Sequence, residues 1–138
     1  MPSLVYTSCI DDLAKNNIKF STDTFKMMLV TSTYTASKNH TKRSDITNEV
    51  TGTGYTAGGN TAAASLTLDT TNNREDINFT ITSWTSATIT ARAGVIYKSR
   101  GGLASADELV GYVDFGSDVT STNGTFAVTI SSPLRFQN

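Results

Sequence analysis

Apolar and polar residues alternate along much of this chain, in the pattern of β-strands that bury one face. Every second side chain is apolar in 77–81, in 89–97 and in 126–130, and shorter stretches of the same pattern run through 24–31 and 109–115. Period-two alternation places the apolar side chains on one face of a sheet. With Leu66 and Leu68 marking a further strand, we predict eight or nine short strands, which is typical of an antiparallel sandwich or barrel.

Turn residues separate the predicted strands. The pair Asn123-Gly124 indicates a tight hairpin turn between a strand at 109–115 and one at 125–131, and a last short strand is expected at 134–136. The glycine-rich stretch 52–59 is interpreted as a flexible bend. One short helix is expected near 9–15, capped by Ser8 and ended by Asn16, because Ser favours helix starts and Asn tolerates left-handed backbone.

Length and charge limit the classes of protein that fit. The 138 residues are expected to form a single domain over 1–138, with a core large enough to need no disulfide. The lone cysteine, Cys9, is interpreted as a small buried apolar residue. A net charge of −1 argues against nucleic-acid binding. No apolar stretch approaches the length needed to cross a bilayer, so no membrane partner is expected.

Candidates for catalysis and metal binding are few. His40 is the single histidine and there is one cysteine, whereas transition-metal sites normally use several such ligands. The glycines of 52–59 lack the lysine of a phosphate-binding loop and the strand–helix context of a dinucleotide site. Trp84 is expected to pack in the core or at its rim. We therefore expect a non-enzymatic protein without a cofactor. An enzyme that hydrolyses glycosides with paired carboxylates is the weakest alternative.

Two groups of residues are candidates for contact with a partner protein. The polar loop around His40 holds Lys38, Lys42 and Arg43, which suit either a solvated loop or an electrostatic contact with an acidic surface. The terminal segments carry apolar side chains where fraying is expected unless they dock. For these segments core packing and partner contact both stay open, and the residues are Leu4, Val5 and Tyr6 with Leu134, Arg135 and Phe136.

Several stretches resemble small structural proteins of tailed bacteriophages. These are EVTGTGYTAGG at 49–59, ATITARAGVIYK at 87–98 and ELVGYVDFG at 108–116, together with LVY at 4–6 and FKMMLV at 25–30. The family that they resemble is the capsid cement, or decoration, proteins with a jelly-roll fold, as in Bordetella phage. The resemblance implies an all-β, jelly-roll-like antiparallel β-sandwich with a short N-terminal helix.

The resemblance also implies a role in the virion. Such a protein is made in the host cytoplasm, binds the outer surface of an icosahedral capsid, and bridges neighbouring major capsid protein subunits so that the DNA-filled head is stabilised. Self-association is expected, with a homodimer favoured, because a dimer gains from binding two neighbouring sites at once. A phage tail or head–tail component, and a carbohydrate- or receptor-binding module, remain alternatives.

Overall fold

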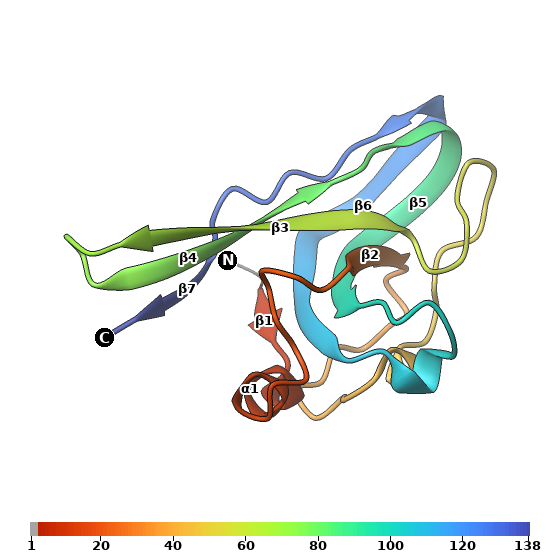
Figure 1. Cartoon of the computed structure of the whole chain (residues 1–138). Helices are drawn as coiled ribbons and strands as arrows, with labels where there is room; N and C mark the ends of the chain where they lie inside the picture. The colour runs from red at the N-terminus through yellow and green to blue at the C-terminus, as the bar shows by residue number, and fades with distance from the viewer. Residues whose placement is uncertain (1–2) are drawn as a thin grey trace.

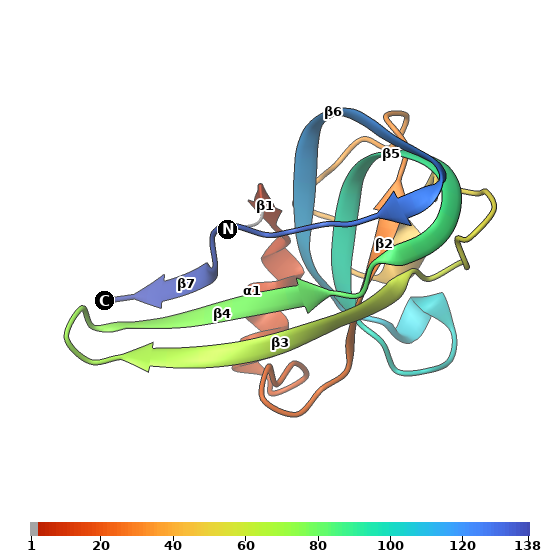
Figure 2. The same ribbon diagram turned by 90° about the horizontal axis from the view of Figure 1, so that it is seen from above.

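A computed structural model describes residues 3–138 as a strongly curled antiparallel sheet from which a long arm projects (Figures 1 and 2). One α-helix and two 3-10 turns accompany the strands. The elements in chain order are β1 (Leu4–Val5), α1 (Thr7–Ala14), β2 (Phe25–Val30), η1 (Arg43–Asp45), β3 (Asn60–Asp69), β4 (Arg74–Ile81), β5 (Trp84–Lys98), η2 (Ala104–Ala106), β6 (Leu109–Phe126) and β7 (Leu134–Gln137).

The pairing order of the strands is β1-β6-β5-β2-β3-β4-β7, and each pair is antiparallel. The pairs β3:β4, β2:β5 and β1:β6 are nested, as in one long hairpin that has been rolled up. Strand β3 pairs with β2 at its start and with β4 along its length, and so joins the curled part to the arm. The predicted all-β, antiparallel fold with a short N-terminal helix is confirmed.

The number of strands and one predicted turn were wrong. The described residues form seven strands, because β6 runs unbroken from Leu109 to Phe126 through the expected hairpin turn. Asn123 does have the left-handed backbone expected of it (φ 45°), but Gly124 pairs with Ala87 of β5, so the turn conformation is absorbed as an irregularity in the ladder. Of the predicted strand at 125–131, Thr125 and Phe126 belong to the end of β6, and Thr129 forms a single bridge with Thr80.

The curled part of the sheet, which we call the body, is buried on both of its faces along β2 and the second half of β5. An inner core contains Phe25, Met27 and Leu29 from alternate positions of β2. Met28 and Val30, which point the other way, belong to an outer core with Tyr6, Tyr34 and Ile46 from the segments that cover the sheet. The unbroken apolar run in 27–30 is therefore explained, since a strand covered on both faces needs no polar side.

An irregularity in β5 divides the expected alternation between these two cores. Ile89 and Ala91 lie in the inner core, whereas Val95 and Tyr97 lie in the outer core. The register with β6 shifts between Ala91 and Ala93, and such a shift exchanges the faces of the following residues. Gly94 confirms the exchange, since a Cβ there would lie 2.5 Å from the Met27 sulfur on the inner side.

The remaining local predictions have mixed outcomes. Helix α1 spans Thr7–Ala14 and Asn16 follows it with φ 64°, as expected, and the Cys9 side chain is buried. Ser8 does not cap the helix, because Tyr6 occupies the cap position and the Ser8 hydroxyl instead donates to the His40 carbonyl. The helix is thus placed by burial of its inner side chains and by contact with the loop around His40.

The glycine-rich stretch 52–59 is pinned to the body rather than a flexible bend. The carboxylate of Glu49 accepts hydrogen bonds from the Tyr55 hydroxyl (2.6 Å) and the Gly58 amide (2.7 Å). Gly59 has φ 77°, and a Cβ there would lie 1.8 Å from the Met27 carbonyl oxygen. Glycine is required here for close backbone approach, so the stretch serves packing of the loop against β2.

Candidate functional site: the projecting arm and the adjoining surfaces

The arm consists of the β3–β4 hairpin with β7 along its outer side (Figures 1 and 2). Because β3 and β4 pair from Ala62 with Ile81 to Asp69 with Arg74, alternate positions line one face of the arm. One face is apolar and continuous with the inner core. It comprises Ala62, Ala64, Leu66 and Leu68 of β3, Ile77, Phe79 and Ile81 of β4, and Leu134 and Phe136 of β7.

This apolar face is buried at the base of the arm and exposed towards its tip. At the base, Phe79 stacks edge-to-face on Phe25 of the body with ring centroids 5.8 Å apart. Farther out, Leu66 is 44% exposed, Phe136 46% and Leu68 72%. The body therefore ends before the apolar stripe does, which leaves large apolar side chains in water along the outer part of the arm.

The opposite face of the arm carries self-neutralising charge. Arg135 of β7 makes a two-pronged contact with Asp76 of β4, at 2.7 Å and 3.0 Å, and this lowers the pKa of Asp76. Arg74 lies 3.3 Å from Asp69 and 3.6 Å from Asp76. Two cations and two anions thus balance, so this face presents no net charge to a partner.

The outer edge of the arm is the free edge of β7. In the described residues β7 pairs with β4 alone and ends the sheet order. The Asn138 amide donates to the Asn73 carbonyl, so that pair is a hydrogen-bonded one. Bonded and non-bonded pairs alternate along an antiparallel ladder, and the backbone groups of Arg135 and Gln137 therefore point away from β4. Such groups are a template for pairing with another strand.

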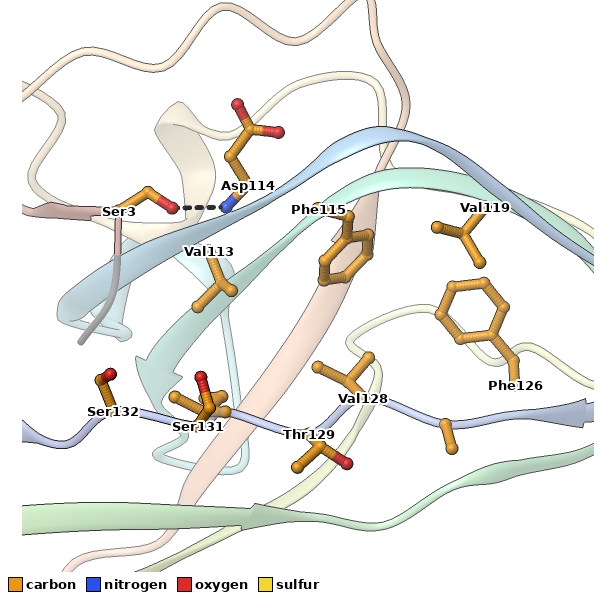
Figure 3. A pocket seen from close by; sticks show the side chains of 12 residues that line it. Ser3, Val113, Asp114, Phe115, Val119, Phe126, Val128, Thr129, Ser131 and Ser132 are labelled. Atoms are coloured by element: carbon orange, nitrogen blue, oxygen red, sulfur yellow. Dashed lines mark hydrogen bonds between the residues drawn. The ribbon is translucent and has the colours of Figure 1, made fainter.

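A second surface feature is a groove where the curled sheet does not close on itself. It has a volume of about 410 Å³ and lies between β6 and the segment 127–132 (Figure 3). Phe115 and Val119 of β6 lie on one side of it and Phe126 and Val128 on the other, and Val113 and Ile130 also line it. At one end the Ser3 hydroxyl accepts a hydrogen bond from the Asp114 amide (2.9 Å). The partly exposed apolar lining extends the inner core to the surface.

The basic loop that the sequence analysis selected is held mainly by contacts within the chain. Arg43 donates to buried Asp107 (2.8 Å), and its guanidinium lies 5.1 Å from the centre of the Tyr97 ring. Lys42 lies 3.7 Å from buried Glu108. Only Lys38 of the three candidate cations is exposed and without an ion pair among those found in residues 3–138. A partner that bound Lys42 or Arg43 would compete with their ion pairs to Glu108 and Asp107.

Glu108 is the best example of charge used for internal structure. Burial by itself would raise the pKa of Glu108, but Arg100 grips both carboxylate oxygens at 2.6–3.0 Å and Lys42 adds its charge, so the pKa is lowered. The amide of Arg100 also donates to Asp107 (2.9 Å). This cluster joins the loop at Lys42 and Arg43 to the stretch 100–108, which is distant in sequence, and it has a clear structural role.

The predicted terminal residues divide between core and surface. Leu4 and Val5 form β1 and are half-buried against β6, and Tyr6 is completely buried, with its hydroxyl 3.0 Å from that of Tyr34. Leu134 is buried as well. Burial favours the core interpretation for Tyr6 and Leu134. Phe136 is exposed and lies on the arm, where its role in an interface stays a prediction.

Sequence reasoning missed the exposed residues of β3. Leu66 and Leu68 were used as evidence for a strand, and strand alternation places such residues towards a core. The same pattern holds in Ile77 and Phe79, which are buried. The length of the arm beyond the body distinguishes the two pairs, and no local sequence signal marks where the body ends.

Residues 3–138 carry few features of other kinds of site. In this part of the chain no cluster of three or more His, Cys, Asp and Glu side chains is suited to hold a metal ion. None of its helices has the length and apolar character of a bilayer-spanning helix. Trp84 is buried in the inner core between Tyr55 and Phe126, as expected. No family model, curated protein or solved structure matches the chain.

Proposed function

We propose that this chain is a non-enzymatic structural protein that binds the outer surface of an icosahedral phage capsid, bridges neighbouring major capsid protein subunits, and stabilises the DNA-filled head. The single observation that supports an assembly role most strongly is the arm, which carries Leu66, Leu68 and Phe136 into water beside a free strand edge. Exposed apolar side chains next to unpaired backbone groups are typical of protein-binding surfaces.

The assignment of the partner as a capsid comes from the sequence resemblance, and the arm is the means by which bridging would occur. A protein that bridges neighbouring subunits must extend beyond its compact part, and the arm extends beyond the body in this way (Figure 2). A protein that binds only the assembled shell stabilises the shell by mass action, and many weak contacts on one lattice add together. Binding and bridging capsid subunits in this way needs no catalytic residues.

The proposal is tested by adding the purified chain to heads that lack it and measuring co-sedimentation and the temperature at which the heads release DNA. We expect bound protein and a higher release temperature. Leu68→Asp should reduce occupancy, because a carboxylate on the apolar face of the arm opposes docking. Leu103→Asp is the matched control, since Leu103 is 77% exposed but lies outside the arm.

The basic loop needs a different variant from a simple charge reversal of Lys42 and Arg43, which would disrupt the pairs with Glu108 and Asp107. Lys38→Glu leaves those pairs intact and tests whether an acidic capsid surface contacts the loop. Unchanged occupancy would remove Lys38 from the proposed contact set.

Three outcomes would overturn the capsid proposal. Absence of the protein from heads, together with its presence in purified tails, would favour the tail or head–tail alternative. Binding of the isolated chain to host cells or to a glycan array would favour a receptor or carbohydrate module. Turnover of a small molecule by the purified chain would exclude a purely structural role.

A further inference from the structure

We infer that the arm associates with the arm of a second copy of this chain, by antiparallel pairing of β7 with β7 of the partner around a two-fold axis at Phe136. The inference rests on the proposed assembly role and names the occupant of one part of the arm, its free β7 edge. Its test uses the purified protein without capsids. It depends on the edge, the apolar face and the charges of the arm, which are taken in turn.

The free edge of β7 is self-complementary in one particular register. Its outward-facing backbone groups belong to Arg135 and Gln137, as the bond from Asn138 to Asn73 indicates. With the axis at residue 136, Arg135 lies opposite Gln137 of the partner subunit, and both pairs use outward N–H and C=O groups. The pairing then supplies four backbone hydrogen bonds, and the ladder between β7 and β4 is unchanged.

Neighbouring registers are worse for specific reasons. An axis at residue 135 places Arg135 against Arg135 of the partner subunit, and like charges directly opposite are destabilising. That register also places Gln137 opposite Pro133 of the partner subunit, and proline has no amide hydrogen to donate. Moving the axis from residue 136 to residue 135 thus introduces both a repulsion and a missing donor, and the register at Phe136 avoids both.

The apolar face becomes continuous in this arrangement. Leu68, Glu75 and Phe136 lie side by side across β3, β4 and β7. Pairing at the axis therefore brings Phe136 against Phe136 of the partner subunit, in a non-hydrogen-bonded pair with Cα atoms about 4.5 Å apart. Aromatic pairs in this position are among the favourable cross-strand pairs. The exposed ring of each copy is thus covered by the other.

Charge does not oppose the association. Arg74 and Arg135 are balanced by Asp69 and Asp76 on the polar face. Glu75 is the charged residue of the apolar face, and the two copies of Glu75 would lie three strand spacings apart, about 14 Å. That separation exceeds the Debye length of about 8 Å at physiological ionic strength, so their repulsion is largely screened.

We choose a second copy as the partner, rather than an unrelated strand, because this pairing gives a closed dimer. Pairing β7 with itself uses the free edges of both arms and leaves neither for further growth, as expected of an isologous dimer. The other end of the sheet is β1, a strand of only two residues, and short edge strands resist pairing. Strand β7 is therefore the edge available for a closed dimer.

The first test replaces Phe136 by cysteine. Cα atoms about 4.5 Å apart are within the range for a disulfide, so mild oxidation of Phe136→Cys should give a covalent dimer that traps the association even where loss of the ring weakens it. We expect linking at least about tenfold faster than for Leu103→Cys, because paired thiols have a raised effective concentration. Leu68→Cys should also link slowly, since residue 68 lies two strands from β7. The buried Cys9 provides the background in the unaltered chain.

The second test isolates the backbone contact. Gln137→Pro removes an outward amide hydrogen that the single chain does not use, whereas Gln137→Ala retains it; both lose the side-chain bond from Gln137 to the Asn72 carbonyl. Sedimentation velocity over a range of concentrations should show dimer for the unaltered chain and Gln137→Ala, and monomer for Gln137→Pro. Circular dichroism should show both variants folded.

Three results would overturn the inference. These are a monomer at every soluble concentration, equal association of Gln137→Pro and Gln137→Ala, and linking of Phe136→Cys no faster than that of Leu103→Cys. Each is independent of capsid binding: a chain that dimerises but does not bind heads contradicts the proposed function alone, and a monomer that binds heads contradicts the inference alone.

Discussion

The body and the arm of this molecule use the same strand chemistry with opposite results. In β2 and the second half of β5, both faces are covered, by the inner core on one side and by Tyr6, Tyr34 and Ile46 on the other. In β3 the alternation is equally regular, yet Leu68 is 72% exposed. The difference lies in the segments that cover each strand: β2 and β5 are covered on both faces, and the outer part of β3 is not. Whether an apolar side chain of these strands is buried therefore depends on the neighbouring segments and not on the sequence of the strand itself.

Charge follows the same division. In the body, the carboxylates of Asp107 and Glu108 are buried and are held by Arg43 and Arg100. On the arm, Arg135 pairs with Asp76 of the adjacent strand, and this carboxylate is more exposed. Buried pairs are costly to break from one side, whereas exposed pairs contribute little. Disruption should therefore affect the body much more than the arm.

The largest expected effect is on the junction of the two regions. Phe25→Ala removes a buried ring that packs on Phe20 and Phe79, with centroids 5.4 Å and 5.8 Å away. We expect a loss of about 4 kcal/mol in the free energy of unfolding, measured by urea denaturation. A loss below about 1 kcal/mol would mean that this aromatic cluster does not hold the arm to the body.

The next largest effect on the free energy of unfolding is expected within the arm, where a buried and an exposed residue of the same face are compared. Ile77→Ala, at a buried site on the apolar face, should lower the free energy of unfolding by about 3 kcal/mol. Leu68→Ala, on the same face nearer the tip, should change it by less than about 0.5 kcal/mol in dilute monomer. Equal effects in urea denaturation would contradict the boundary between buried base and exposed tip.

The third prediction concerns the buried carboxylate of Asp107. Arg43→Ala removes its charged partner while Asp107 stays buried, and we expect a loss of about 2 kcal/mol because a hydrogen bond to a charged group is lost. Lys15→Ala is the control from an exposed pair at the end of α1, with Asp11, and should leave the free energy of unfolding almost unchanged. Thermal unfolding of the two variants measures the contrast.

The smallest expected effect is a pH dependence. The pKa of Glu108 is lower in the folded chain than the ordinary value of about 4.3, so its contribution to stability is complete above that pH and is lost as the pH falls through the folded pKa. The unaltered chain should therefore lose more stability than Glu108→Gln between pH 7 and pH 3. Urea midpoints at the two pH values give the measurement.

Much of the fold could be predicted from local pattern. The segments around Phe25, Phe79 and Ile89 were placed as strands, and the short helix and the last strand at Leu134 were placed close to their observed bounds. What failed was the course of β6, because Asn123-Gly124 has the composition of a hairpin turn and only pairing with Ala87 keeps the strand continuous. Turn chemistry is local, whereas the ladder that overrides it is not.

The candidate site divides in the same way. Phe136 was selected from sequence as an apolar residue near a chain end, and it is exposed on the arm. Lys42 and Arg43 were selected as a basic loop, and their carboxylate partners lie more than sixty positions away in the chain, which no local reading connects to them. Leu66 and Leu68 had the pattern of core residues and were not selected at all.

The sequence by itself determined that this protein is a β-structure with balanced charge, because side-chain alternation and composition act locally and need no knowledge of the partners. Only the tertiary structure decided which alternating faces are covered, where the register shift in β5 divides one stripe between two cores, and how far the arm extends past the body. These features depend on contacts between distant segments, and the free energy of burial belongs to those contacts rather than to any single stretch of the chain.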